Sequence, residues 1–128
     1  MKKVISIVLR LIAAFIMIQT LWFKFTGAEE SVYIFSQVGI EPWGRIGTGV
    51  AELIAAVLLL IPRTIIFGAL MAIGIMLGAI VTHLFILGIE VKGDGGQLFA
   101  YALIVLVASV ILVFLHFDQV QQIKKSRV

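Results

Sequence analysis

The stretch that decides the fold runs from Trp43 to Arg63 and reads WGRIGTGVAELIAAVLLLIPR. It has the length and the apolar character of a membrane-spanning helix, but it carries Glu52 near its middle. A carboxylate at that depth costs about 3 kcal/mol on insertion scales unless a partner or water meets it. Small residues on the same stretch let a neighbouring helix approach closely: Gly47, Gly49, Ala51, Ala55 and Ala56. We therefore expect this helix to pack inside a bundle, with Glu52 facing other helices.

The composition of the whole chain indicates a membrane protein. Of 128 residues, 62% are hydrophobic and 13% are charged, which leaves too little polar surface for a soluble domain of this size. Four apolar segments are each long enough to cross ~30 Å of hydrocarbon. They lie at residues 4–25, 43–61, 64–89 and 98–117. The sequence thus predicts an all-α integral membrane four-helix bundle, with residues 1–128 forming a single transmembrane domain.

The first apolar segment begins after MKK, which is also how a secretory signal peptide begins. The segment is longer than the roughly 7–15-residue apolar core of such a signal, and it contains Arg10, Gln19 and Lys24. We therefore expect it to remain in the protein as the first membrane span.

Residues 27–41, between the first two spans, are too polar to cross a membrane. Glu29 suits the first turn of a helix, and Gly39 suits its end. Tyr33 and Trp43 are of the aromatic type that gathers at the membrane surface. The sequence therefore predicts a short helix that lies in the interface between the first and second spans.

The distribution of cations predicts how the chain crosses the membrane. If both termini face the cytoplasm, seven of the Lys and Arg residues lie on that side and three on the other. The seven are Lys2, Lys3, Arg10, Arg63, Lys124, Lys125 and Arg127, and the three are Lys24, Arg45 and Lys92. We expect a bacterial-type inner membrane with both termini cytoplasmic. The net charge of +3 then suits anionic lipid at the membrane surface, and we expect no nucleic-acid partner.

Five polar residues from three spans are predicted to lie at similar depths in the membrane. With a rise of ~1.5 Å per residue, Gln19 and His83 lie roughly 9 Å below the outer surface, and Glu52 roughly 13 Å. Lys24 enters from the outer edge with a side chain long enough to point inward. Arg45 lies two turns from Glu52 on the same helical face. We take these five residues as a candidate polar pocket.

Two interpretations of this pocket are open. In the structural one, Glu52 forms a buried ion pair with Lys24 or Arg45, and His83 donates to a backbone carbonyl. In the functional one, the residues line a small pocket that opens outward and holds or protonates a ligand head group. We expect no metal site, because one His and one Glu are too few ligands. We expect no haem between His83 and His116 either, because the two lie near opposite faces.

Glycines on two of the spans are predicted to be sites of helix packing. Gly74 and Gly78 have the four-residue spacing that lets two helices cross closely. Gly49 lies one turn from Glu52 among the small residues of the second span. We expect close contacts between helices at all three.

The ordered set of motifs along the chain resembles the DoxX family. The set comprises Arg10-Leu11, Lys24-Phe25-x-Gly27, Phe35-x-x-x-Gly39-x-x-Pro42, Gly49-x-x-Glu52-Leu53, Pro62-Arg63, Gly68-Ala69 and Gly78-Ala79-x-x-x-His83. The resemblance extends over nearly the whole chain, including the glycine-rich loop at residues 93–96. It implies a four-helix inner-membrane protein. The family takes its name from a subunit of a thiosulfate:quinone oxidoreductase, and some relatives are associated with membrane oxidoreductase complexes that handle oxidative or thiol stress.

Two functions are therefore open. The first is a membrane subunit of an oxidoreductase assembly, whose pocket holds a quinone, a small sulfur compound or another small ligand. The chain has no cysteine and no flavin or nucleotide motif, so we expect no intrinsic cofactor. It would then be an accessory subunit whose redox partners carry the electrons. The second is a non-enzymatic small-molecule carrier or membrane scaffold, and a homo-oligomer is open in both cases.

Overall fold

The computed structural model describes residues 2–89 and 95–118, and every regular element among them is a helix. The long helices are α1 (Lys2–Thr26), α3 (Trp43–Leu60), α4 (Ile65–Thr82) and α5 (Gln97–Leu115), and the short one is α2 (Glu29–Val38). A 3₁₀ turn, η1 (Pro62–Thr64), joins α3 to α4, and a π-helical turn, η2 (His83–Leu87), extends α4. Within these described ranges four helices are long and apolar enough to cross a membrane, and each predicted span falls on one of them. The predicted all-α class with a four-helix bundle is confirmed.

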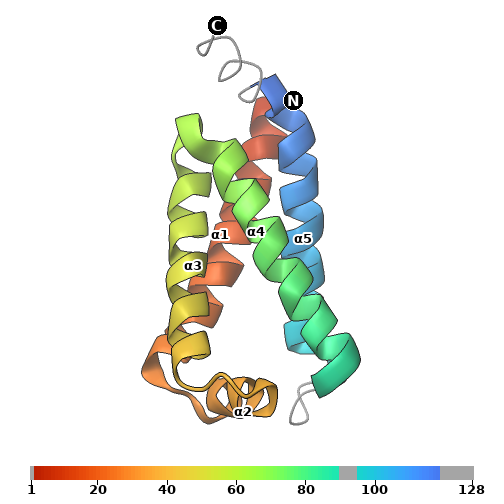
Figure 1. Cartoon of the computed structure of the whole chain (residues 1–128). Helices are drawn as coiled ribbons and strands as arrows, with labels where there is room; N and C mark the ends of the chain where they lie inside the picture. The colour runs from red at the N-terminus through yellow and green to blue at the C-terminus, as the bar shows by residue number, and fades with distance from the viewer. Residues whose placement is uncertain (1, 90–94, 119–128) are drawn as a thin grey trace, which may run out of the picture.

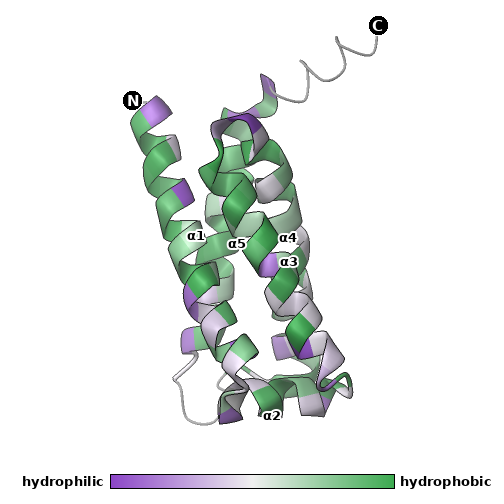
Figure 2. Ribbon diagram, turned by 90° about the vertical axis from the view of Figure 1, so that its left-hand side faces the viewer, coloured by the Kyte–Doolittle hydropathy of each residue, from purple (hydrophilic) through white to green (hydrophobic). Residues whose placement is uncertain are grey.

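The four long helices form a closed ring of neighbours. α1 packs against α3 and α5, and α4 packs against the same two helices. The short helix α2 lies across one end of the bundle, which we call the α2 end (Figure 1). The start of α1 and the end of α5 lie together at the opposite end, which we call the terminal end. Figure 2 shows that the sides of the bundle are mainly apolar and that hydrophilic residues gather toward the two ends.

Alanines on every long helix form much of the core. Side chains this small let the helix backbones approach one another, as is typical of bundles that lack a hydrophobic driving force in lipid. The buried alanines are Ala13 and Ala14 of α1, Ala55 and Ala56 of α3, Ala69 and Ala72 of α4, and Ala102 and Ala108 of α5. Met17, Leu59 and Leu112 fill the remaining space with fully buried side chains.

The backbones of α3 and α4 approach each other closely at Gly68. A Cβ atom there would lie 2.7 Å from the backbone nitrogen of Leu59 and 2.9 Å from the carbonyl oxygen of Ala55. At Gly74 and Gly78, by contrast, a Cβ atom would meet no atom of the described residues within 4 Å. The predicted close contact at this pair is therefore wrong for the single chain. The two helices separate after Gly68, and the pair lies where they stand apart.

Gly49, the third of the predicted packing glycines, does lie at a contact. A Cβ atom there would lie 2.7 Å from Cε1 of Phe25, so the glycine makes room for an aromatic ring at the end of α1.

The short helix α2 ends at Gly39, as predicted. Gly39 adopts φ 86°, and its N–H bonds the carbonyl oxygens of Phe35 and Ser36 at 3.0 and 3.1 Å.

The terminal end is joined by polar contacts between helices. Arg10 donates from Nε to the carbonyl oxygen of Leu59 at 2.6 Å and from Nη2 to that of Leu60 at 3.0 Å. These carbonyls belong to the last turn of α3, where a cation is favourable. Ser6 of α1 and His116, just after α5, are joined by a hydrogen bond of 2.6 Å. The predicted loop glycine Gly93 and the cations of residues 92 and 124–127 lie outside the described residues.

Candidate functional site: a polar cavity at the α2 end

A cavity of about 640 Å³ lies between the four long helices and α2. It occupies the half of the bundle in which α3 and α4 stand apart. All five α-helices and η2 contribute to its wall. The polar side chains that line it include Gln19, Thr20 and Lys24 of α1, Glu52 of α3, His83 of η2 and Tyr101 of α5.

Glu52 is the most deeply buried charge of the cavity, with 2% of its side chain exposed. Its Oε1 lies 2.6 Å from Nζ of Lys24, and its Oε2 accepts a hydrogen bond of 2.8 Å from Oγ1 of Thr20. Thr20 and Lys24 are four residues apart, so both point from the same face of α1 toward α3. Each carboxylate oxygen therefore has a donor, and the pair carries no net charge.

Sequence reasoning missed Thr20 and selected its neighbour Gln19 instead. Gln19 lines the cavity, but the carboxylate of Glu52 is bonded by Thr20. A signal for Thr20 was present in the sequence, because it lies one helical turn before Lys24 on the same face. A threonine inside an apolar helix usually bonds its own backbone, which is why it attracts little attention. Oγ1 of Thr20 also lies 3.0 Å from the carbonyl oxygen of Met17, so the carbonyl and the carboxylate of Glu52 share its single proton.

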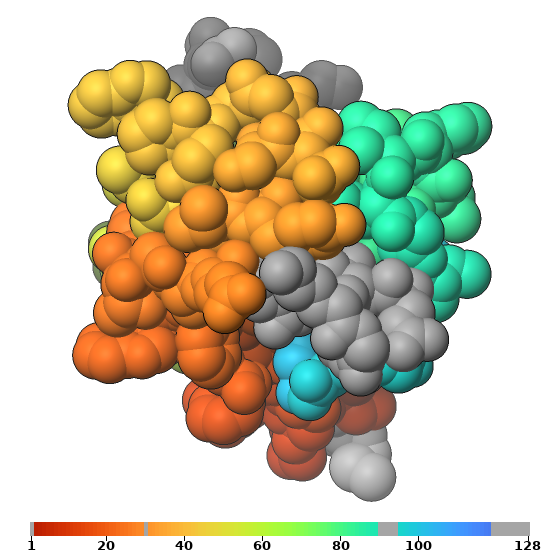
Figure 3. Space-filling model, turned by 90° about the horizontal axis from the view of Figure 1, so that it is seen from below, coloured from red at the N-terminus to blue at the C-terminus, as the bar shows by residue number. Residues whose placement is uncertain are grey.

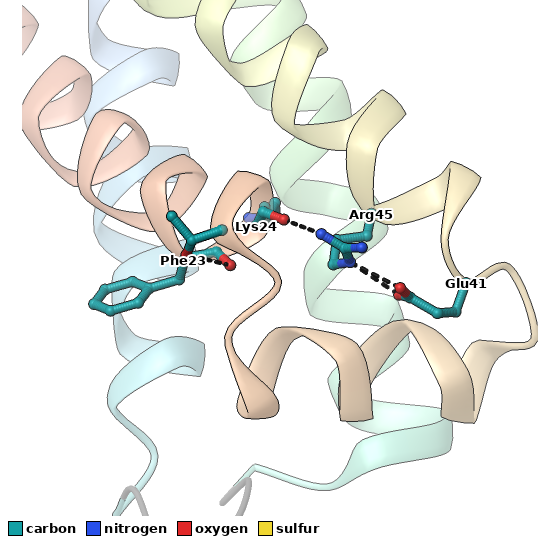
Figure 4. A network of polar contacts seen from close by, with 5 residues as sticks. Phe23, Lys24, Glu41 and Arg45 are labelled. Atoms are coloured by element: carbon teal, nitrogen blue, oxygen red, sulfur yellow. Dashed lines mark hydrogen bonds and ion pairs between the residues drawn. The ribbon is translucent and has the colours of Figure 1, made fainter.

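Arg45 does not belong to the cavity. Its Nε lies 2.9 and 3.1 Å from the two carboxylate oxygens of Glu41, four residues earlier, and its Nη1 donates to the backbone carbonyl of Lys24 (Figure 4). Of the two cations that were left open as partners of Glu52, Arg45 is thus paired with Glu41, which lies just before α3. Arg45 instead ties the start of α3 to the last turn of α1. It positions the backbone that carries Lys24.

His83 lines the cavity from the opposite side, with 5% of its surface exposed. Its Nδ1 donates to the carbonyl oxygen of Gly88 at 3.0 Å, because a carbonyl can only accept. Nε2 is then the acceptor nitrogen of the neutral ring. The ring meets Phe99 edge to face, with centroids 5.6 Å apart. His116 lies at the terminal end, so the two histidines cannot share one ligand. Among the described residues, no cluster of three or more His, Asp or Glu could hold a metal ion.

The fold and the site together define a class of protein: a multi-pass membrane protein built as a four-helix bundle, with a polar cavity in one half. Comparison with known protein families identifies the family to which the chain belongs. The sequence model of the DoxX-like family matches residues 7–112, a range that includes every cavity residue named above. The chain belongs to the DoxX-like family. No curated protein and no solved structure matches it.

Proposed function

We propose that this DoxX-like protein is a ligand-binding membrane subunit of an oxidoreductase assembly, with a quinone or a small sulfur compound in its cavity. The observation that carries the proposal is the cavity itself, whose wall includes the buried Lys24–Glu52 ion pair. Its 640 Å³ falls within the range of about 300–1,000 Å³ that is typical of small-molecule sites. A bundle that needed the ion pair only for packing would have no need of the space beside it.

The donors around the cavity suit a ligand with two acceptor groups. The ammonium of Lys24 has three N–H donors, and its contact with Glu52 occupies one. Tyr101 accepts a hydrogen bond of 2.8 Å from Nε2 of Gln97, so its own hydroxyl proton can point to another acceptor. Both Gln97 and Tyr101 line the cavity. A quinone, which carries two carbonyl oxygens, is the ligand type that these donors favour.

The redox step itself would need a partner. The chain has no cysteine, so it has no thiol that could carry electrons. A quinone takes up two electrons and two protons when it is reduced to the quinol. In the proposed assembly the electrons come from a partner subunit, and Glu52 and His83 are titratable groups of the cavity that can exchange the protons.

The alternative is a non-enzymatic carrier or scaffold, and one observation favours it. Both oxygens of Glu52 and the Nδ1 of His83 already have partners within the chain. Such contacts would hold the bundle together without any ligand. The two functions differ in what the cavity does when a ligand is offered.

Thermal unfolding with and without decylubiquinone, in lipid nanodiscs, distinguishes a cavity that binds a ligand from one that is only part of a scaffold. A ligand that binds only the folded state stabilises it by about 2.7 kcal/mol at a hundred times its Kd. We expect stabilisation of the wild type and of Glu41→Gln, which alters an ion pair outside the cavity. We expect none for Glu52→Gln, which has nearly the same volume but no charge. If decylubiquinone and a soluble thiosulfate salt both fail to stabilise the wild type, the scaffold function is favoured.

We propose in addition that the terminal end faces the cytoplasm of a bacterial-type inner membrane. The excess of Lys and Arg on that side supports this orientation. Reporter fusions after Val128 should then be active in the cytoplasm, and fusions within residues 93–96 on the opposite side. A C-terminal reporter that is active outside the cytoplasm would contradict the orientation and would place the cavity in the other leaflet.

A further inference from the structure

We call the part of the cavity wall where α3 and α4 stand apart the mouth. Gly47 of α3 and Gly74 and Gly78 of α4 all line the cavity, and all three are exposed. A Cβ atom at any of them would meet no described atom within 4 Å. The wall therefore has no side chain at these three positions, on either side of the gap between the two helices.

The position of these glycines on their helices shows where the mouth leads. Gly74 lies four residues after Leu70 and three before Leu77, so the three share one face of α4. Leu70 and Leu77 are 50% and 49% exposed and do not line the cavity. Large apolar side chains that are exposed on a membrane-spanning helix face hydrocarbon. The mouth thus opens at the edge of the lipid-facing surface.

The α2 end of the cavity is covered by apolar side chains. Ile34, Phe35 and Val38 of α2 line the cavity from that end. Seen from the α2 end, α2 spreads across the bundle between α1 and the end of α4 (Figure 3). The functional interpretation of the sequence expected a small pocket that opens outward. In the structure the apolar side of α2 lies over it, and exposed glycines lie at its side.

We propose that the cavity takes an amphipathic molecule from the bilayer, whose polar head contacts Thr20, Lys24 and Glu52 and whose apolar tail leaves between Gly47 and Gly78 into the hydrocarbon. This rests on the proposed function in one respect, namely that the same cavity binds a ligand. The head meets the polar side chains at the inner end of the cavity. The tail stays in an apolar environment along its whole path, so it loses no favourable solvation when the molecule binds. A water-soluble sulfur compound has no use for such a mouth, and a lipid-soluble quinone has.

The test compares two probes that differ only in the tail: decylubiquinone and its tail-free benzoquinone analogue. Gly78→Leu places a side chain in the mouth without touching the head site. It should weaken the binding of decylubiquinone about tenfold or more, and change that of the tail-free analogue by less than about twofold. Gly74→Leu should act in the same direction. Val81→Phe is the matched control, because it adds bulk at an exposed residue of α4 that does not line the cavity, and it should change neither affinity.

The outcomes separate this inference from the proposed function. If the wild type binds both probes and Gly78→Leu and Gly74→Leu leave decylubiquinone binding unchanged, the mouth is not the path of the tail and the inference is overturned. The same holds if the two probes lose affinity equally, since the substitution then acts on the head site. If the wild type binds neither probe, this inference and the quinone form of the proposed function both fail, and only binding of a small sulfur compound would then support the proposed function. Melting curves without ligand check that each variant is folded, which we expect because a Cβ atom at Gly74 or Gly78 meets no described atom.

Discussion

At the terminal end of the bundle α3 and α4 pack backbone against backbone at Gly68, whereas at the α2 end the same two helices stand apart around a cavity. The terminal end is closed by direct contacts, among them the bonds from Arg10 to the last carbonyls of α3. The α2 end is held chiefly by the contact between Lys24 of α1 and Glu52 of α3, beside the cavity. Because the helices are packed together at the terminal end, the bundle can contain a cavity at the α2 end and still hold together.

The comparison also shows that one residue type has two opposite uses in this chain. Gly68 is a glycine because the backbone of α3 lies where its side chain would be. Gly74 and Gly78 have open space at the same point. In the first case the glycine permits contact, and in the second it leaves a gap. The substitutions below measure how different the two ends are, beginning with the largest expected effect.

The largest loss of stability is expected from Lys24→Met at the α2 end. It leaves the carboxylate of Glu52, which is 2% exposed, without its cation. Removing one partner of a buried ion pair typically costs about 3–5 kcal/mol, and replacing both partners by neutral groups costs much less. The double variant Lys24→Met with Glu52→Gln should therefore recover most of the loss. Unfolding in detergent measures both. A loss below about 1 kcal/mol for the single variant would mean that water in the cavity solvates Glu52.

At the terminal end, Gly68→Val should cost about 1–3 kcal/mol, because the added side chain overlaps the backbone of α3. Gly78→Val is the matched substitution at the other end of α4, and it should stay within about 0.5 kcal/mol of the wild type. Chemical unfolding of the two variants in the same detergent provides the comparison. Equal losses would show that α3 and α4 are as close at Gly78 as at Gly68.

A loss of similar size, about 2 kcal/mol, is expected from Arg10→Met, because two charge-assisted bonds to α3 are lost while the apolar stem is kept. Arg10→Lys should recover only part of the loss, since a lysine cannot reproduce the two bonds made by one planar guanidinium. The melting temperatures of the three proteins decide the matter. If Arg10→Met melts like the wild type, the terminal end is held by packing alone.

Most of the fold could be predicted from the sequence, because the length and hydropathy of a span are local properties. That Glu52 would meet a cation, either Lys24 or Arg45, followed from depth and from the cost of a bare carboxylate, but the choice of Lys24 did not. Thr20 and the Glu41–Arg45 pair did not follow, because a choice among nearby partners depends on the rotation of each helix. The role of Gly68 as against Gly74 and Gly78 could not be predicted either. Glycine spacing is the same whether a neighbouring helix is close or distant. Where α3 and α4 cross determines which glycines of α4 contact α3, and the sequence does not show that point.

Both proposals require that the cavity at the α2 end is a ligand site and that it is open toward the lipid. An experimental structure of the protein determined in lipid with decylubiquinone tests this most directly. We predict the quinone ring in the cavity, with one carbonyl oxygen within hydrogen-bond distance of Lys24 or Thr20 and the tail between Gly47 and Gly78. A structure in which α3 and α4 close the space, or in which the quinone lies elsewhere while the cavity holds only water, would contradict the account.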